Sequence, residues 1–157
     1  MKSRAEISPC KSYRYALWRE WSDDPPVLFV MLNPSTADDS QDDPTIRRCI
    51  AFAKHWGYGG LIVANLFAWR STYPAHLKSV RDPIGPSNDQ WLNKLAKQSA
   101  MVVGAWGNHG TYMRRGQAVA ALFPRLQCLG VTKQGQPRHP LYVPSATQPT
   151  SMQASHV

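Results

Sequence analysis

One asparagine in this sequence lies where its side chain could act directly on a substrate. Asn33 comes directly after a short, wholly apolar run and is followed by Pro34. Because the residue before a proline is held extended, the Asn33 side chain has a defined direction, and its amide can orient a water molecule or hold a carbonyl group. The alternative is a local Asn-Pro turn without a chemical role.

Four carboxylates follow in the same polar loop: Asp38, Asp39, Asp42 and Asp43. A carboxylate at a strand end can act as a general base or bind a cation. Asp43 directly precedes Pro44, a pair typical of a helix start, so Asp43 is also expected to cap a helix. The alternative for the group is therefore one cap and three solvated charges.

A second asparagine, Asn65, ends another apolar run. Its amide offers donors and an acceptor, which suit the edge of a nucleobase. The loop after it interleaves aromatic side chains with a cation: Phe67, Trp69, Arg70 and Tyr73. Aromatic rings can stack on a base while the cation holds a phosphate. The alternative is that these aromatic residues belong to the core and cover the edge of a sheet.

A histidine near the end of the chain lies in a stiff loop. His139 is placed between Pro137 and Pro140. An imidazole titrates near neutral pH, so His139 could donate a hydrogen bond to an anion that develops during a reaction. Lys133 and Arg138 flank it and favour a phosphate nearby. The alternative is a basic surface loop.

A glycine-flanked pair, Asn108 and His109, opens a predicted helix. A helix N-terminus with glycines can bind a phosphate group. The sequence has neither the Lys-Ser/Thr pair of a P-loop nor a G-x-G-x-x-G motif, so we exclude a P-loop or dinucleotide-binding fold.

Alternating strands and helices are expected to bring these positions together. Apolar runs predict buried strands at 27–32, 61–66, 100–106 and 126–130. Helices are predicted from Asp43 to Gly57, over 89–98 with Ser87 or Asn88 as its cap, and over 111–121. Right-handed crossovers between such elements give an α/β fold of three layers, α/β/α, around a central, mainly parallel four-stranded sheet. Residues 13–21 are expected to add one or two N-terminal edge strands.

This arrangement gives a place for the site. In open α/β sheets, ligands bind beyond the carboxyl ends of the strands. The loops selected by this rule begin at Asn33, Asn65, Trp106 and Val131. Three of these loops carry an Asn or His within three residues of the strand end. We expect these side chains to converge at one edge of the sheet.

Composition limits the classes of protein that fit. A chain of 157 residues indicates one domain, expected over 1–146, with a disordered Pro-, Gln- and Ser-rich tail over 147–157. Neither a signal peptide nor a bilayer-spanning run is visible, so we expect a cytoplasmic monomer that does not contact a membrane. The three cysteines are far apart, which excludes a four-thiolate metal site unless histidines contribute, and we expect no cofactor and no metal. The net charge of +8 favours a polyanionic partner, nucleic acid above all.

The same segments resemble known families. VLFVMLNPSTAD (27–38) resembles the first motif of the uracil-DNA glycosylase superfamily, AWGNH (105–109) is similar to its strand-ending W-G turn, and RHPLYVPS (138–145) is similar to its H-P-S-P-L-S loop. NPSTAD, DDPTIRRC, the stretch from WGY to NLFA, and GPSND closely resemble DUF1643, a family of bacterial and phage proteins. The glycosylase likeness is the more distant of the two.

The glycosylase resemblance implies an enzyme that extrudes a nucleotide from double-stranded DNA and hydrolyses its N-glycosidic bond. It implies that Asn33, aided by an acid, positions water, and that His139 steadies the departing base or the sugar cation. It implies a site with these members: catalytic Asn33, Asp38, Asp43 and His139; base-recognising Pro34, Ser35, Asn65, Phe67, Trp69 and Tyr73; DNA-contacting Arg70, Asn108, His109, Lys133, Arg138, Tyr142 and Ser145.

Departures from the superfamily motifs bear on the substrate. Ser-Thr-Ala follows Asn-Pro where the better-known branches have Tyr or Gly, the stacking Phe has no obvious counterpart other than Trp69 or Tyr73, and the third loop lacks the early Ser. We therefore expect a modified pyrimidine rather than uracil, with glucosylated 5-hydroxymethylcytosine of phage DNA as the specific candidate, in phage defence or base excision. The alternatives are a hydrolase or transferase acting on free nucleosides or nucleotides, and a non-catalytic adaptor that binds nucleic acid.

Overall fold

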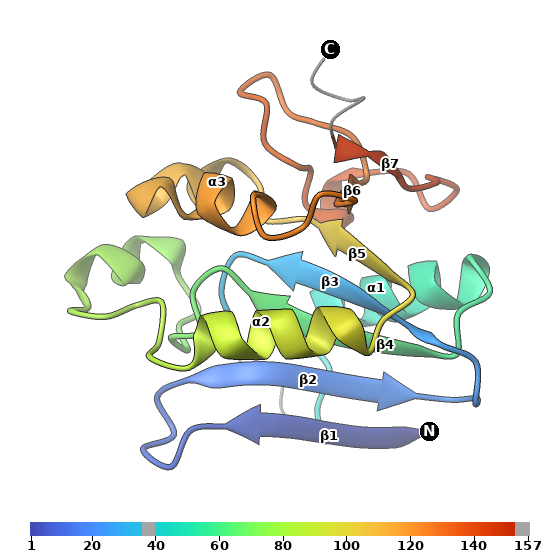
Figure 1. The fold of residues 1–157 in the computed structure, drawn as a ribbon, viewed down its shortest axis with the longest axis horizontal. Coiled ribbons are helices and arrows are strands. Elements are labelled where there is room, and N and C mark those ends of the chain that lie inside the picture. The colour runs from blue at the N-terminus through green and yellow to red at the C-terminus, as the bar shows by residue number, and fades with distance from the viewer. Residues whose placement is uncertain (36–39, 153–157) are drawn as a thin grey trace.

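The strands of the chain form one mixed sheet (Figure 1). The computed structural model describes residues 1–35 and 40–152. Within these residues the sheet has seven strands in the order β1-β2-β4-β3-β5-β6-β7. Their bounds are β1 Lys2–Ile7, β2 Arg14–Glu20, β3 Pro26–Met31, β4 Gly60–Asn65, β5 Met101–Gly104, β6 Gln127–Cys128 and β7 Thr150–Ser151.

The pairing of the strands confirms the α/β class and corrects the size of the sheet. β3 pairs in parallel with β4 and with β5, and β5 pairs in parallel with β6. Antiparallel pairs flank this centre: β1 with β2, β2 with β4, and β6 with β7. The expected four-stranded sheet is therefore wrong as a description of the whole, because β1, β2 and β7 extend it to seven strands.

Apolar side chains on both faces explain why β3 and β4 lie in the middle. Val27, Leu28, Phe29 and Val30 are completely buried. A strand without polar alternation must be covered on both faces, which a parallel sheet between helical layers provides. Two groups of packed apolar residues result, one on each face of the sheet.

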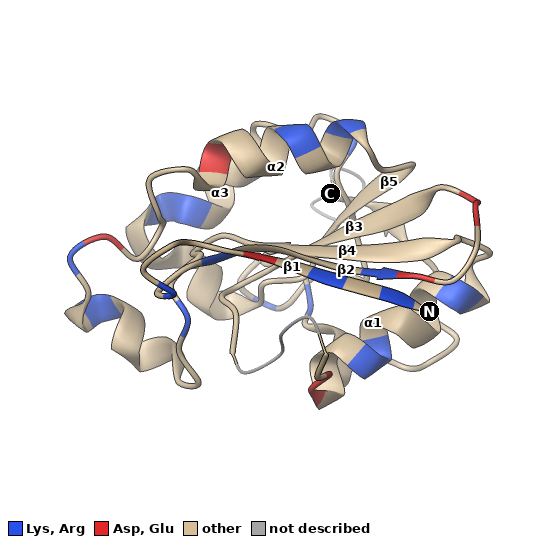
Figure 2. Cartoon of the chain, turned by 90° about the horizontal axis from the view of Figure 1, so that it is seen from below, with Lys and Arg blue, Asp and Glu red and all other residues tan. Residues whose placement is uncertain are grey.

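Helices lie on both faces of the sheet, with α1 on one side and α2 and α3 on the other (Figure 2). α1 contributes Ile46, Cys49 and Phe52 to one apolar group, and α2 contributes Leu92 and Leu95 to the other. No helix in the part of the chain that is described is long and apolar enough to cross a membrane. The bounds are α1 Pro44–His55, α2 Asn88–Lys97 and α3 Arg115–Ala120, with 3-10 turns η1 Pro74–Ser79, η2 Asn108–Arg114 and η3 Pro140–Tyr142.

The two longer helices begin in different ways. Asp43 caps α1 as predicted: its side chain accepts from the Ile46 N–H, and Pro44 is in the first turn. For α2, Ser87 occupies the N-cap position as one of the two predicted candidates, but its side chain makes no hydrogen bond to the helix. The other candidate, Asn88, lies inside the helix with its side chain directed to β4. The Asn88 side-chain amide donates to the backbone carbonyls of Asn65 and Leu66.

Three other regions differ from the expectation. Residues 13–21 do not form the sheet edge, because β1 pairs on the outer side of β2. The helix predicted over 111–121 is interrupted by Met113 and Arg114, both in left-handed conformation, and begins at Arg115. The chain also continues in the sheet to Ser151, beyond residue 146, and Met152 is buried.

The strand order places a crevice at the carboxyl ends of the parallel strands. β3 comes first among these strands, and its neighbours β4 and β5 lie on opposite sides of it. The loop after β3 leads to α1 on one face, whereas the loop after β5 leads to α3 on the other face. Loops that leave adjacent strands toward opposite faces open a gap between them, where α/β proteins bind ligands.

Candidate functional site

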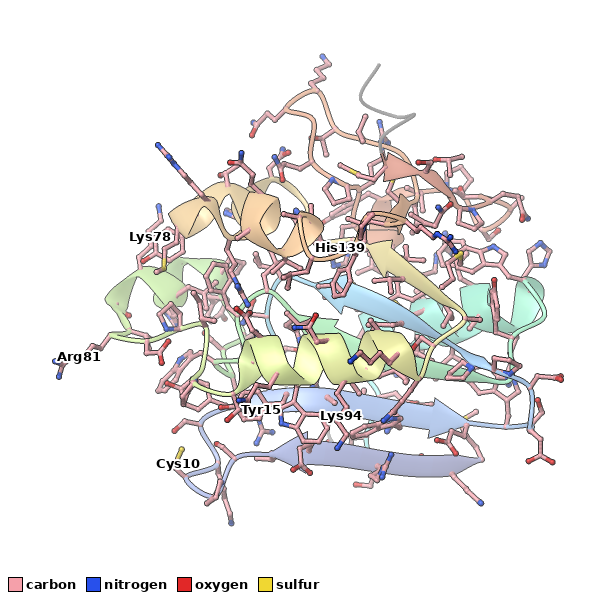
Figure 3. All side chains as sticks on the ribbon, viewed as in Figure 1. Cys10, Tyr15, Lys78, Arg81, Lys94 and His139 are labelled. Carbon is pink, nitrogen blue, oxygen red and sulfur yellow. The ribbon has the colours of Figure 1, made fainter. Side chains whose placement is uncertain are left out.

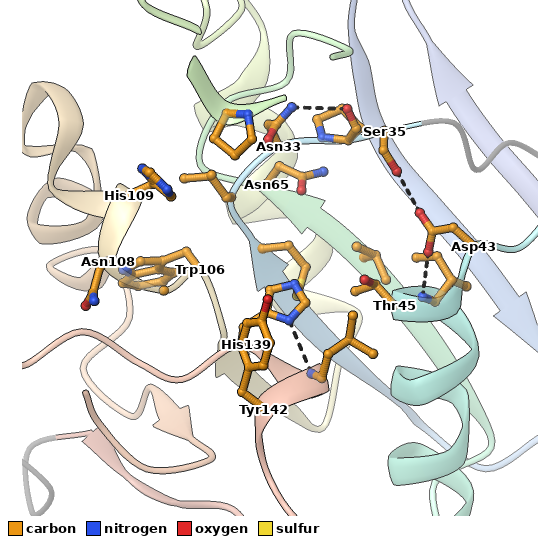
Figure 4. A pocket seen from close by; sticks show the side chains of 18 of the residues that line it. Asn33, Ser35, Asp43, Thr45, Asn65, Trp106, Asn108, His109, His139 and Tyr142 are labelled. Atoms are coloured by element: carbon orange, nitrogen blue, oxygen red, sulfur yellow. Dashed lines mark hydrogen bonds between the residues drawn. The ribbon is translucent and has the colours of Figure 1, made fainter. Parts of the chain in front are cut away.

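A pocket of about 870 Å³ occupies this crevice (Figure 4). The segments after β3, β4, β5 and β6 and the first turn of α1 all contribute to its walls. Most predicted site residues therefore meet in one place. Those that line it are Asn33, Pro34, Ser35, Asp43, Asn65, Asn108, His109, Lys133, Arg138, His139 and Tyr142.

The loop after β4 reaches the pocket through Ser71, Thr72 and Pro74, but its predicted aromatic side chains do not line it. Phe67 is completely buried in the core, so for this residue a role in base recognition is wrong. Trp69 packs edge-on against Tyr13, with ring centroids 5.6 Å apart. Tyr73 is 62% exposed and packs against His76. The alternative interpretation of this loop, that it covers the sheet edge, fits these contacts better.

Three further predicted residues lie apart from the pocket. Arg70 is half-buried, and its backbone N–H donates to the Ser12 carbonyl. Ser145 lines a separate, smaller cavity against α1. Asp38 falls outside the described residues. The structure thus brings together the strand-end residues and the His139 loop, and leaves out the aromatic side chains and Arg70 of the loop after β4.

Asn65 presents an unsatisfied amide to the pocket. The residue is 1% exposed, and its Nδ2 has no hydrogen-bond partner among the residues that the structure describes. A buried amide N–H group without a partner is rare, since it loses its bonds to water and gains none in return. An acceptor atom of a bound ligand would satisfy it.

Asn33 is held firmly and keeps its oxygen available. Its Nδ2 donates to the Ser71 carbonyl at 2.8 Å and to the Pro34 carbonyl at 3.2 Å. Because both bonds use the nitrogen, Oδ1 is the atom that can accept from a water molecule or a substrate. The Ser71 N–H donates to the Pro34 carbonyl, so the loops after β3 and β4 brace each other.

The state of His139 is set by its own loop. Its Nδ1 accepts from the Leu141 N–H at 3.2 Å, which leaves Nε2 to carry the proton of the neutral ring. Burial lowers the pKa of His139 below 6.5, and the nearby Asp43 carboxylate opposes this only in part. At neutral pH the side chain is therefore an uncharged Nε2–H donor.

Asp43 and Ser35 form the wall on the α1 side (Figure 4). One carboxylate oxygen of Asp43 accepts from the Ile46 N–H, and the other accepts from the Ser35 hydroxyl at 2.7 Å. Asp43 is therefore both the helix cap and a fixed acceptor in the pocket. Arg48, from the next turn of α1, donates to the carbonyls of Pro140 and Val143 and so holds the His139 loop against the same helix.

Trp106 forms another wall that we did not predict as a site residue. Its Nε1 donates to the Gln136 side-chain oxygen at 3.1 Å. The ring packs so closely on Gly110 and Gly116 that a Cβ at Gly110 would lie 2.0 Å from its Cδ1. The Gly107 N–H donates to the Pro137 carbonyl at 2.8 Å, which ties this turn to the His139 loop.

Arg14 is a second pocket residue that sequence reasoning missed. It starts β2, which runs antiparallel to β4, so it lies beside the carboxyl end of β4 although it is distant in sequence. It is 2% exposed. The sequence offers no clear signal for this position, because β2 also contains Arg19 and Glu20.

The cysteines do not contribute to this chemistry. Cys49 is buried, and burial raises its pKa, so its thiol stays protonated at neutral pH. Cys10 lies on the β1–β2 loop, far from His139 (Figure 3). Within residues 1–35 and 40–152, no group of three or more His, Cys, Asp or Glu side chains is placed to hold a metal ion.

The fold and the pocket together define an α/β protein with a polar ligand pocket at the carboxyl ends of its parallel strands. The chain belongs to the DUF1643 family, because the model of that family, described as "Protein of unknown function (DUF1643)", matches residues 14–141. This match confirms the predicted family and includes the pocket residues from Arg14 to Leu141. No curated protein and no solved structure matches the chain.

Proposed function

We propose that the protein is a DNA glycosylase that hydrolyses the N-glycosidic bond of a modified pyrimidine, and that the pocket receives the extruded base. The observation that carries the proposal is the buried, unpartnered Asn65 amide in a pocket that Asn33 and His139 also line. A base carbonyl oxygen would accept from the Asn65 amide and satisfy it, as is needed when a flipped base is read by its polar edge.

The same groups can assist bond cleavage. When the bond between the sugar C1′ and the base nitrogen breaks, its electron pair leaves with the base, and negative charge develops on the base oxygens. The neutral His139 Nε2–H can donate to such an oxygen, an interaction that strengthens as the charge grows. Water then adds to C1′. Asn33 Oδ1 accepts a hydrogen bond from the hydrogen that stays on the new hydroxyl group, and the other proton passes through the Asp43 carboxylate or solvent to the departing base.

The size of the pocket supports a modified base. A volume of about 870 Å³ is in the range that encloses drug-sized ligands and exceeds the needs of a bare pyrimidine ring. The additional space lies beside polar groups, since Ser35, Asp43 and Thr45 line it. Hydroxyl groups of a sugar substituent could bond there, which makes glucosylated 5-hydroxymethylcytosine the specific candidate.

Cations at the rim support a nucleic-acid substrate. Lys133 and Arg138 line the pocket and are exposed, so each can approach a phosphate. Tyr142 lies at the same rim and is 77% exposed. A cationic rim with an exposed aromatic ring suits a DNA backbone next to an extruded nucleotide.

The test is base release from defined DNA. Duplexes that contain cytosine, uracil, 5-hydroxymethylcytosine or its glucosylated form are incubated with the protein, and released bases are identified by mass spectrometry. We expect release from modified DNA alone. Intact DNA across the whole panel would refute the proposal, and release from free nucleosides but not from DNA would favour the nucleoside hydrolase.

The variant that tests the key observation is Asn65→Leu. It removes the unsatisfied amide but keeps the branched shape of the side chain, so we expect base release to fall by about 10²–10³-fold. The thermal midpoint should be unchanged or raised, because Nδ2 has no hydrogen bond to lose among the described residues. Asn93→Leu, at an exposed position on α2, is the matched control and should retain full activity.

A further inference from the structure

Two buried polar side chains reach the end of β4 from the helical layer that contains α2 and α3. Asn88, completely buried at the start of α2, donates from Nδ2 to the Asn65 carbonyl at 2.9 Å and to the Leu66 carbonyl at 3.1 Å. Arg115, 5% exposed at the start of α3, donates from Nε to the same Leu66 carbonyl at 2.8 Å. Its Nη2 donates to the Asp89 carboxylate.

This arrangement is an unfavourable way to fill a protein interior. A buried guanidinium loses its hydration, and the ion pair with Asp89 compensates weakly because the Asp89 side chain is 60% exposed. Asn88 also leaves its Oδ1 without a partner among the described residues. Apolar side chains in their place would remove the donors to the buried Asn65 and Leu66 carbonyls. The two polar side chains therefore hold the backbone at 65–66 at the cost of their own desolvation.

The backbone before Arg115 adds to that cost. Met113 and Arg114 are consecutive residues in left-handed conformation, with φ of 55° and 54°. A Cβ makes this conformation unfavourable, and such outliers gather at functional sites. The turn ends directly before Arg115, whose side chain reaches the Leu66 carbonyl.

We infer that Asn88 and Arg115 are positioning residues that fix the Asn65 amide in the pocket. The inference rests on the proposed function, in which Asn65 reads the base. Asn65 Nδ2 has no hydrogen-bond partner among the described residues, so the direction of the amide depends on the backbone at 65–66. The bonds from Asn88 and Arg115 to the two carbonyls hold that backbone.

The experiment compares Arg115→Met with Arg125→Met, which removes the same charge at an exposed position. The side-chain amide resonances of Asn65 are assigned in a nitrogen–proton spectrum by their absence in Asn65→Leu. In Arg115→Met we expect these resonances to broaden or double, and kcat for base release to fall about tenfold or more with KM within threefold. The control should match the unsubstituted protein in both readouts, and Arg115→Lys should recover part of the loss.

Two results would overturn the inference. One is an Arg115→Met spectrum whose Asn65 amide resonances superimpose on those of the unsubstituted protein. The other is a kcat within twofold of the unsubstituted value despite a lower thermal midpoint, since a merely structural role predicts that result. If Arg115→Met does not fold, Asn88→Ala and Arg115→Lys are judged by the same readouts. The resonances need no substrate, so failure of base release would refute the proposed function alone.

Discussion

At the scale of single residues, local hydrogen bonds decide which atom each side chain offers to the pocket. Asn33 uses its nitrogen on the Ser71 and Pro34 carbonyls and offers an oxygen. His139 uses Nδ1 on the Leu141 N–H and offers Nε2–H. Asn65 offers its nitrogen. Donors and an acceptor therefore face one space from three loops.

The pKa of His139 predicts the pH dependence of activity. Below its lowered pKa the ring gains a proton on Nδ1, the atom that faces the Leu141 N–H. The hydrogen bond between Leu141 and His139 is then lost, and the Nε2–H group moves with the ring. We expect kcat/KM to be constant above pH 6.5 and to fall about tenfold per pH unit below the lowered pKa. A kcat/KM profile with no fall on the acid side, or an acid-side fall that persists unchanged in His139→Gln, would contradict this role for His139.

The same shift has a consequence for stability. The pKa is lower in the folded than in the unfolded chain, so the unfolded chain binds the proton more readily. The contribution of His139 to stability is therefore complete above pH 6.5 and is lost as pH falls through the folded pKa. His139→Gln should remove this part of the acid sensitivity, as measured by urea unfolding at several pH values.

Site residues could be predicted where a local sequence signal marks them, and not where their role depends on distant segments. Asn33, Asn65 and His139 could be found because strand ends and proline-braced loops are visible in sequence. Arg14, Asn88 and Arg115 could not, because their roles depend on carbonyls and loops that are distant in sequence. The aromatic loop was assigned to the pocket because its composition is the same whether it stacks on a ligand or packs inward, as Phe67 does.

At the scale of elements, a start signal was more informative than a periodic pattern. Asp43 followed by Pro44 defines the start of α1, and the structure has that cap. The helix predicted over 111–121 is interrupted in the structure, and nothing in its sequence shows that Gly110 and Gly116 must accommodate the Trp106 ring. Strand β1 was missed because its alternating charged residues give little strand signal.

Two glycines give a prediction at this scale. Gly110→Ala places a Cβ within 2.0 Å of Trp106, so we expect a loss of about 1–3 kcal/mol and a displaced pocket wall. Gly57→Ala meets no atom within 4 Å but has a φ of +86°, so it should cost about 1 kcal/mol and keep the pocket. Urea unfolding and base release measure both effects. Equal activity of the two variants would show that Trp106 does not shape the site.

At the scale of the whole molecule, the parallel pairing of the central strands could be predicted, but their order and the limits of the sheet could not. Right-handed crossovers between alternating strands and helices favour parallel pairing and leave the choice of neighbours open. The strand Thr150–Ser151 lies in a segment whose composition suggested disorder, and only its pairing with β6 shows otherwise. Short edge strands depend on their neighbours more than on their own sequence.

The net charge of +8 predicts how DNA binding responds to salt. If Lys133 and Arg138 each contact a phosphate, the logarithm of the binding constant falls linearly with the logarithm of salt concentration. The double change Lys133→Gln and Arg138→Gln should reduce that slope by about 2. Lys97→Gln with Arg125→Gln, at exposed positions outside the pocket, should leave it unchanged. Equal slopes for both pairs would place the DNA elsewhere.

The dispersed origin of the pocket also governs when it can exist during synthesis of the protein. Its walls come from residues between Arg14 and Tyr142, and β3 needs β5 before its second side is paired. The Asn33 wall therefore leaves the ribosome long before the His139 wall. A nascent chain therefore has the central strands but no completed pocket until the His139 loop has emerged.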